Sequence, residues 1–78
     1  MTPDLLRTIG KALYGACWTK PLAEALGVNL RSLQRWRDGD TQPSPDAVPG
    51  LLADMRKLLV ARGRELERVV AMVDKALP

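Results

Sequence analysis

Apolar side chains recur every three or four residues along most of the chain, which is the spacing of one helix face. The first run predicts a helix over residues 3–14. Its apolar face is expected to contain Leu5, Leu6, Ile9, Ala12 and Leu13. Thr2 can cap this helix, and Pro3 suits the first position because an N–H there has no helical partner. Gly15 is the expected stop.

Two shorter helices follow, close together in the sequence. The first begins near Thr19, which is expected to cap it, and ends at Gly27. Its inward face is predicted to consist of Leu22, Ala23 and Leu26. Asn29 is the expected cap of the next helix, in which Leu33 and Trp36 lie three residues apart on one face. We assign these last two side chains to the core.

The carboxy-terminal part predicts one long amphipathic helix from about residue 48 to 77, on the order of 40 Å if unbroken. Three prolines and two glycines in "DGDTQPSPDAVPG" indicate an ordered loop before it. Apolar residues then recur every seven positions at Leu52, Leu59, Leu66 and Val73. At the apolar heptad positions that fall between these residues, Arg62 breaks the pattern. The sequence leaves open whether the helix is continuous through Gly63.

These elements predict an all-α domain of about four to five helices with a long C-terminal helix. Strands are not expected, because the valines do not alternate with polar residues and Phe is absent. We expect residues 1–47 to form the core domain, with a motif at 19–38, and residues 48–78 to pack on this core and then dimerise. Tyr14 and Trp18 are expected to wall the core.

Composition excludes several classes of function. Histidine is absent and Cys17 is the only cysteine, so the usual zinc ligands and an internal disulfide are lacking. Glu65, Glu67 and Asp74 are interspersed with basic residues, as on a solvated helix face, and there is no Gly-rich phosphate loop. We therefore expect no enzyme activity, no metal, no cofactor and no small-molecule ligand. The sequence contains no long apolar run that would indicate export or a membrane span. A cytoplasmic protein is therefore expected.

The segment "TKPLAEALGVNLRSLQRWRD", residues 19–38, has the pattern of a helix-turn-helix. Small Ala23 permits close approach of the second helix, and Gly27 permits a left-handed backbone at the corner. The segment resembles the helix-turn-helix of the lambda-repressor-like family, which includes phage repressor and Cro proteins, over about a quarter of the chain. The resemblance rests on Leu22, Ala23, Leu26, Gly27, Val28, Leu33 and Trp36. Two positions depart from the family pattern: Asn29 replaces the usual Ser or Thr, and Leu30 occupies a place where a polar residue often reads bases.

This resemblance implies binding of double-stranded DNA, with the helix that starts near residue 30 in the major groove. The residues expected to contact bases are Leu30, Arg31, Ser32, Gln34 and Arg35. Arg31 and Arg35 suit bidentate recognition of guanine, and Gln34 suits adenine. The residues expected to contact phosphates are Thr19, Lys20, Asn29, Arg37 and Thr41. The net charge of +3 agrees with an acidic partner, although a basic helix face is also common as plain solvated surface.

The end of the long helix is predicted to form a homodimer. The dimer contacts are expected from Leu66, Val69, Val70, Val73 and Leu77. The function expected is that of a sequence-specific repressor, associated with the nucleoid when bound, that occupies two half-sites about one DNA turn apart, roughly 34 Å. Two alternatives remain: the segment folds back onto its own chain, or it binds another protein, as in an antitoxin or phage accessory factor acting as an adaptor.

Overall fold

The computed structural model describes residues 1–78 and contains four α-helices and no strand. Helix α1 spans Pro3–Tyr14, α2 spans Thr19–Leu26, α3 spans Leu30–Asp38 and α4 spans Val48–Ala76. A single 3₁₀ turn, η1, covers Gly15–Cys17 between α1 and α2. The all-α fold with a long C-terminal helix is thus confirmed. Helix α4 runs through Gly63 without a break.

The ends of α1 to α3 follow local chemistry. The Thr2 hydroxyl accepts a hydrogen bond from the backbone N–H of Leu5 at 3.1 Å, and the Asn29 side chain accepts one from the N–H of Arg31 at 2.8 Å. Thr19, however, does not cap α2, contrary to the sequence-based expectation. It is the first helical residue, the cap position is held by Trp18, and no side chain caps the α2 N-terminus.

Each of the four helices contributes one almost completely buried side chain to a single core. These are Leu6, Leu22, Leu33 and Met55. The remaining buried apolar residues are Ile9, Leu13, Trp18, Ala23 and Leu51. Trp36 is half-buried and packs against this cluster. The first half of α4 therefore completes the core that α1 to α3 begin.

Three residues predicted to lie in the core are exposed instead. Leu5 and Tyr14 are 42% and 37% exposed, and Ala12 is also exposed. The buried face of α1 is narrower than its apolar pattern, because Leu6, Ile9 and Leu13 already occupy the side that meets the other helices. Gly10 is the fourth buried residue of α1, and it lies directly against the Trp18 indole.

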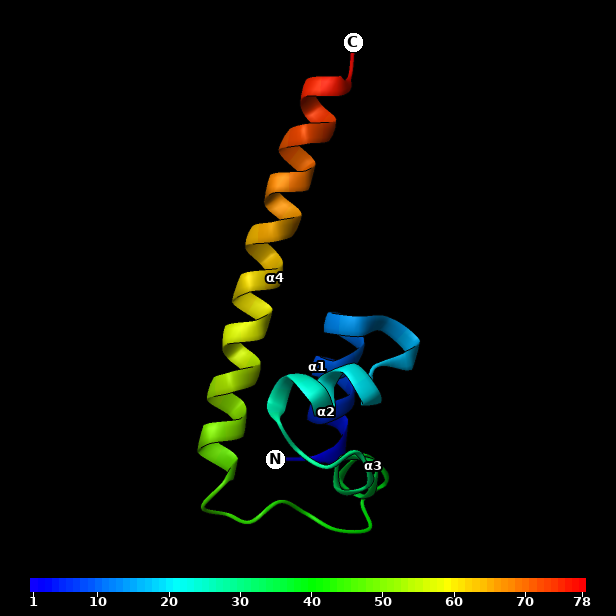
Figure 1. Ribbon diagram of the computed structural model, residues 1–78, viewed down its shortest axis with the longest axis vertical. Coiled ribbons are helices and arrows are strands. Elements are labelled where there is room, and N and C mark those ends of the chain that lie inside the picture. Colours follow the sequence, from blue (N-terminus) through cyan, green and yellow to red (C-terminus); the bar gives the residue numbers. More distant parts are fainter.

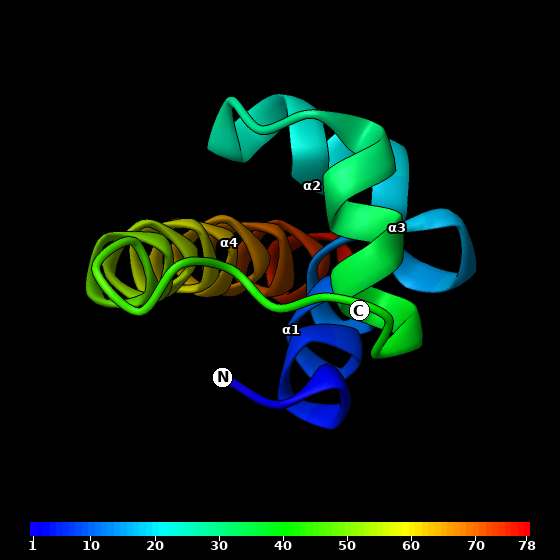
Figure 2. The same cartoon turned by 90° about the horizontal axis from the view of Figure 1, so that it is seen from below.

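The molecule is elongated, with extents of 52 × 22 × 19 Å. Figure 1 shows α1, α2 and α3 grouped beside the lower half of α4, while the upper half projects beyond them. Every residue from Val60 to the C-terminus is exposed. Figure 2, from below, shows α3 in front of α1 and α2, at the end of the molecule opposite the C-terminus of α4.

Candidate nucleic-acid interface

The turn between α2 and α3 sets the direction of α3. Gly27 has a left-handed backbone with φ of 68°, and the N–H groups of Gly27 and Val28 bind the carbonyls of Glu24 and Ala23 at 3.2 and 3.0 Å. This pair of bonds is a Schellman ending, which a residue with a Cβ accommodates poorly at the glycine position. The chain therefore leaves α2 abruptly and enters α3 two residues later.

One face of α3 is anchored in the core and the opposite face is open. Leu33 is fully buried and Trp36 half-buried, and both point toward α1 and α2. Arg31 and Arg35, one helical turn apart, are exposed, and neither forms an ion pair or a side-chain hydrogen bond with the rest of the chain. The two guanidinium groups are consequently available to an outside partner.

The other residues predicted to contact bases lie beside these arginines. Leu30 is 36% exposed, and Gln34 and Ser32 are half-buried at the two edges of the open face. A helix has 3.6 residues per turn, so Arg31, Gln34 and Arg35 share one surface of α3. The structure thus places Arg31 and Arg35 on the open face, with Leu30, Ser32 and Gln34 beside it.

Asp38, which the sequence pattern did not indicate, also belongs to this face. Asp38 lies three and seven residues after Arg35 and Arg31, on the same side of α3. Its oxygens accept hydrogen bonds from Nε and Nη2 of Arg37 at 2.8 and 3.1 Å. The hydrogen bond from Arg37 holds the pKa of the Asp38 carboxyl below its ordinary value, and the same bond raises the pKa of Arg37. Arg37, expected to contact phosphate, is therefore already paired within the chain.

The remaining residues predicted to contact phosphates differ in their availability. Lys20 is exposed at the start of α2 and makes no ion pair, while Thr19 beside it is half-buried. The oxygen of the Asn29 side chain is engaged in capping α3. Thr41 is exposed in the loop after α3. Lys20 and Thr41 are the two members of this set whose side chains are open.

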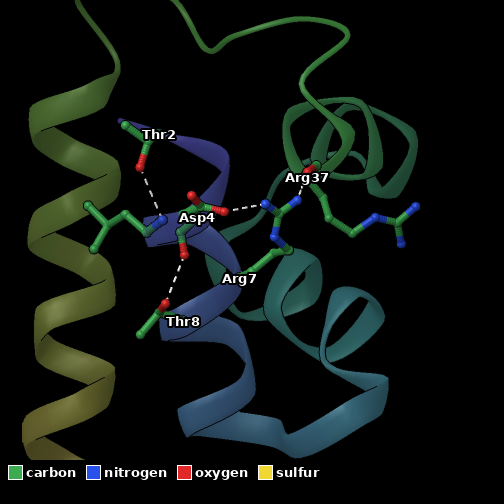
Figure 3. A network of polar contacts seen from close by, with 6 residues as sticks. Thr2, Asp4, Arg7, Thr8 and Arg37 are labelled. Atoms are coloured by element: carbon green, nitrogen blue, oxygen red, sulfur yellow. Dashed lines mark hydrogen bonds and ion pairs between the residues drawn. The ribbon is translucent and has the colours of Figure 1, made fainter.

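Arg7 of α1 fixes the far end of α3, and no sequence pattern indicated this role. Its Nη1 donates to the backbone carbonyl of Arg37 at 2.9 Å, and its Nη2 pairs with the carboxylate of Asp4 (Figure 3). The carbonyls in the last turn of a helix have no helical partner and carry partial negative charge. A guanidinium at this point therefore ties the end of the candidate DNA-reading helix to α1.

Replacing Arg7 with alanine is expected to lower the free energy of unfolding by about 1 kcal/mol, because one charge-assisted hydrogen bond between α1 and α3 is lost. The expected loss of stability is small because the Arg7 side chain is 41% exposed and water screens its charge. Urea denaturation followed by circular dichroism measures the change. Lys57→Ala, which removes the same charge from an exposed and unpaired position on α4, serves as the control and should alter stability by a few tenths of that amount. Equal effects of the two substitutions would contradict the assigned role of Arg7.

The five residues expected to form the dimer contacts gather on the projecting half of α4. Leu66, Val69, Val70, Val73 and Leu77 are between 46% and 62% exposed. Met72, at 64%, extends the same surface. No segment of the chain folds back over them, so this surface is open.

The other chemistry of the chain is sparse. No group of three or more acidic or cysteine side chains is placed to hold a metal ion. None of the helices combines the length and apolar character needed to cross a bilayer. No family model, curated protein or solved structure matches the chain.

Proposed function

We propose that the protein is a sequence-specific DNA-binding regulator of the helix-turn-helix type. The observation that carries this proposal is the open pair Arg31 and Arg35, held outward by a helix whose opposite face is anchored through Leu33. Unpaired guanidinium groups one turn apart on a short exposed helix suit the edges of base pairs in the major groove.

In the proposed complex, α3 enters the major groove with its amino-terminal half toward the bases. Arg31 and Arg35 donate pairs of hydrogen bonds to O6 and N7 of guanine, and Gln34 reads adenine. Leu30 contacts a thymine methyl group, since it presents an apolar surface at the start of the helix. Lys20 and Thr41 contact phosphates on either side and fix the register.

The C-terminal half of α4 supplies the dimer contacts in this proposal. Two copies related by a two-fold axis would address an inverted repeat, with half-sites separated by a whole number of DNA turns, about 34 Å or a multiple of it. The mode of regulation in this proposal is repression by occupation of the operator.

Selection of bound duplexes from a random library tests this function directly. We expect enrichment of one inverted-repeat sequence containing guanine in each half-site, and affinity for it should fall steeply with salt. Each phosphate neutralised contributes about −0.9 to the slope of log K against log salt concentration. Equal affinity for enriched and random duplexes would contradict sequence-specific binding.

Asp38 offers a second test, because it occupies Arg37 and adds negative charge to the proposed DNA-facing surface. Asp38→Asn is expected to free Arg37 for a phosphate, which strengthens DNA binding several-fold at low salt and steepens the salt slope by about 0.9. Fluorescence anisotropy over a range of KCl concentrations measures both. Asp54→Asn, the same substitution at an exposed site on α4, is the control and should leave the slope unchanged. An unchanged slope for Asp38→Asn would exclude Arg37 from the phosphate contacts.

The exposed apolar surface on α4 also supports a second candidate function, that of an adaptor binding a different protein. This surface comprises six large apolar side chains, each between 46% and 64% exposed. A stable hetero-complex, together with function that survives Arg31→Ala and Arg35→Ala, would favour the adaptor over the DNA-binding regulator.

A further inference from the structure

The side of α4 that faces away from the core carries a line of positive charge. Lys57, Arg64, Arg68 and Lys75 follow one another at steps of seven, four and seven residues, and each of these steps returns to nearly the same side of an α-helix. All four side chains are exposed, and none forms an ion pair. This basic stripe, defined by these four residues, is about 27 Å long.

No carboxylate or large apolar side chain interrupts the basic stripe. The other residues on this side of α4 are small and exposed, and they are Gly50, Ala53, Ala61 and Ala71. The carboxylates of α4 lie about 60–100° away around the helix, at Asp54, Glu65, Glu67 and Asp74. An extended partner can therefore approach the stripe along its whole length and meets only positive charge on it.

Arg64 and Arg68 are one helical turn apart and carry like charge. Opposite charges at this spacing stabilise a helix, and like charges destabilise it. The only ion pair of α4 joins Arg62 to Glu65, and its cation lies outside the stripe. The repulsion within the stripe is thus not relieved by the chain itself, and an anionic partner would relieve it.

The character of the stripe favours a duplex over a membrane as this partner. A helix that binds a bilayer surface inserts large apolar side chains between its flanking cations. In α4 the large apolar residues, such as Leu66 and Val73, lie on the side opposite the stripe. A straight line of cations suits a rod-shaped polyanion, and duplex DNA carries one charge per about 1.7 Å of its axis. A hollow of about 410 Å³, lined by Ala61, Arg64, Glu65 and Arg68, leaves space for phosphate oxygens.

The basic stripe and α3 lie on different sides of the molecule. Helix α4 packs on α1 and α2 through the side that bears Leu51 and Met55, and the stripe is on the other side. Figure 2 shows α4 at the left of the molecule and α3 at the right. A duplex held against the open face of α3 is therefore separated from the stripe by the core, and one straight segment cannot contact both.

We propose that the basic stripe of α4 binds the phosphate backbone of a second DNA segment, without regard to its sequence, while α3 holds the operator. The protein thereby bridges two segments of duplex. The bridging rests on the proposed function, whereas phosphate binding by the stripe does not. The dimer contacts of the proposed function lie on the opposite side of α4, so a dimer leaves both stripes open.

Arg64→Gln combined with Arg68→Gln tests the stripe. Titration with a random-sequence duplex, followed by fluorescence anisotropy over a range of KCl concentrations, should show about ten-fold weaker binding at low salt and a slope reduced by about 1.8, because two phosphate contacts are lost. Arg56→Gln combined with Arg62→Gln removes the same charge from exposed arginines outside the stripe. This matched control should lose no more than a few-fold in affinity and keep its slope.

Capture of a second duplex tests the bridging. The selected operator is fixed to beads and loaded with protein, and a fluorescent random-sequence duplex is then added. Beads loaded with the unmodified chain or with the Arg56 and Arg62 variant should retain this second duplex. Beads loaded with the Arg64 and Arg68 variant should bind the protein equally well but retain little of the second duplex.

The outcomes separate this inference from the proposed function. Equal effects of the two paired variants on affinity and slope would overturn the stripe as a DNA contact. Unchanged duplex binding by the Arg64 and Arg68 variant, with loss of binding to phosphatidylserine vesicles, would assign the stripe to a membrane surface instead. Failure of the unmodified chain to retain a second duplex would overturn the bridging. Enrichment of no operator, with random-duplex affinity still dependent on Arg64 and Arg68, would overturn the proposed function and leave the stripe.

Discussion

Replacing both Arg31 and Arg35 with alanine is expected to weaken binding to the selected operator by roughly 100- to 1,000-fold, because each bidentate contact to guanine is worth about 1–3 kcal/mol. Affinity for random duplex should fall much less, since only two charges are lost. The fold should be unaffected, because both side chains are exposed and unpaired. Anisotropy titrations with operator and random duplex measure the difference.

The matched control is Arg56→Ala combined with Lys57→Ala, which removes two positive charges from exposed, unpaired positions on α4. This variant should lose no more than a few-fold in affinity for either duplex. If the Arg31 and Arg35 variant kept its preference for the operator, α3 would not be the element that reads the sequence.

Gly10→Ala is expected to destabilise the protein by about 3 kcal/mol, the largest effect on stability that we predict. An added Cβ would overlap Cε3 and Cδ2 of Trp18, an indole that is only 3% exposed and cannot swing into solvent. Overpacking a closed core typically costs 1–3 kcal/mol, and a domain of this size has only several kcal/mol of net stability, roughly 5–10. Thermal and urea unfolding followed by circular dichroism measure the loss.

Gly50→Ala is the control for this prediction. Gly50 lies in the first turn of α4, and an added Cβ would meet nothing within 4 Å, so the substitution should be neutral or slightly stabilising. In a Trp18→Leu background, Gly10→Ala should lower the free energy of unfolding by less than it does in the unmodified protein, because the smaller side chain gives space to the methyl group. Additive effects of the two substitutions would show that the indole is not the source of the strain.

The helices and their ends were predictable because their causes are local. The apolar spacing gave α1 its bounds of residues 3 and 14, and glycines at positions 15, 27 and 39 mark three ends where the backbone takes a positive φ. The Asn29 cap was also correctly predicted, since a side chain two residues from the N–H that it binds needs no tertiary contact. The prediction for Thr19 was wrong: the cap position belongs to Trp18, whose side chain is buried in the core, and Thr19 is the first helical residue.

The candidate site was predicted only in part. Arg31 and Arg35 were identified from their place in the helix-turn-helix pattern, and their exposure agrees with that interpretation. The pairing of Asp38 with Arg37 and the bond from Arg7 to α3 were not predicted from the sequence. Charged residues next to each other in sequence pair only in some rotamers, and the bond from Arg7 to the carbonyl of Arg37 spans 30 residues.

By itself, the sequence determined the helical fold, the sharp corner at Gly27 and the basic character of α3, because each depends on residues within a turn or two of one another. Only the tertiary structure decided which apolar residues are buried, that Gly10 must stay small beneath Trp18, and that Arg37 is paired with Asp38. These outcomes depend on how four helices share one core and on the rotamers that their packing allows, and neither is encoded in the local spacing of residue types.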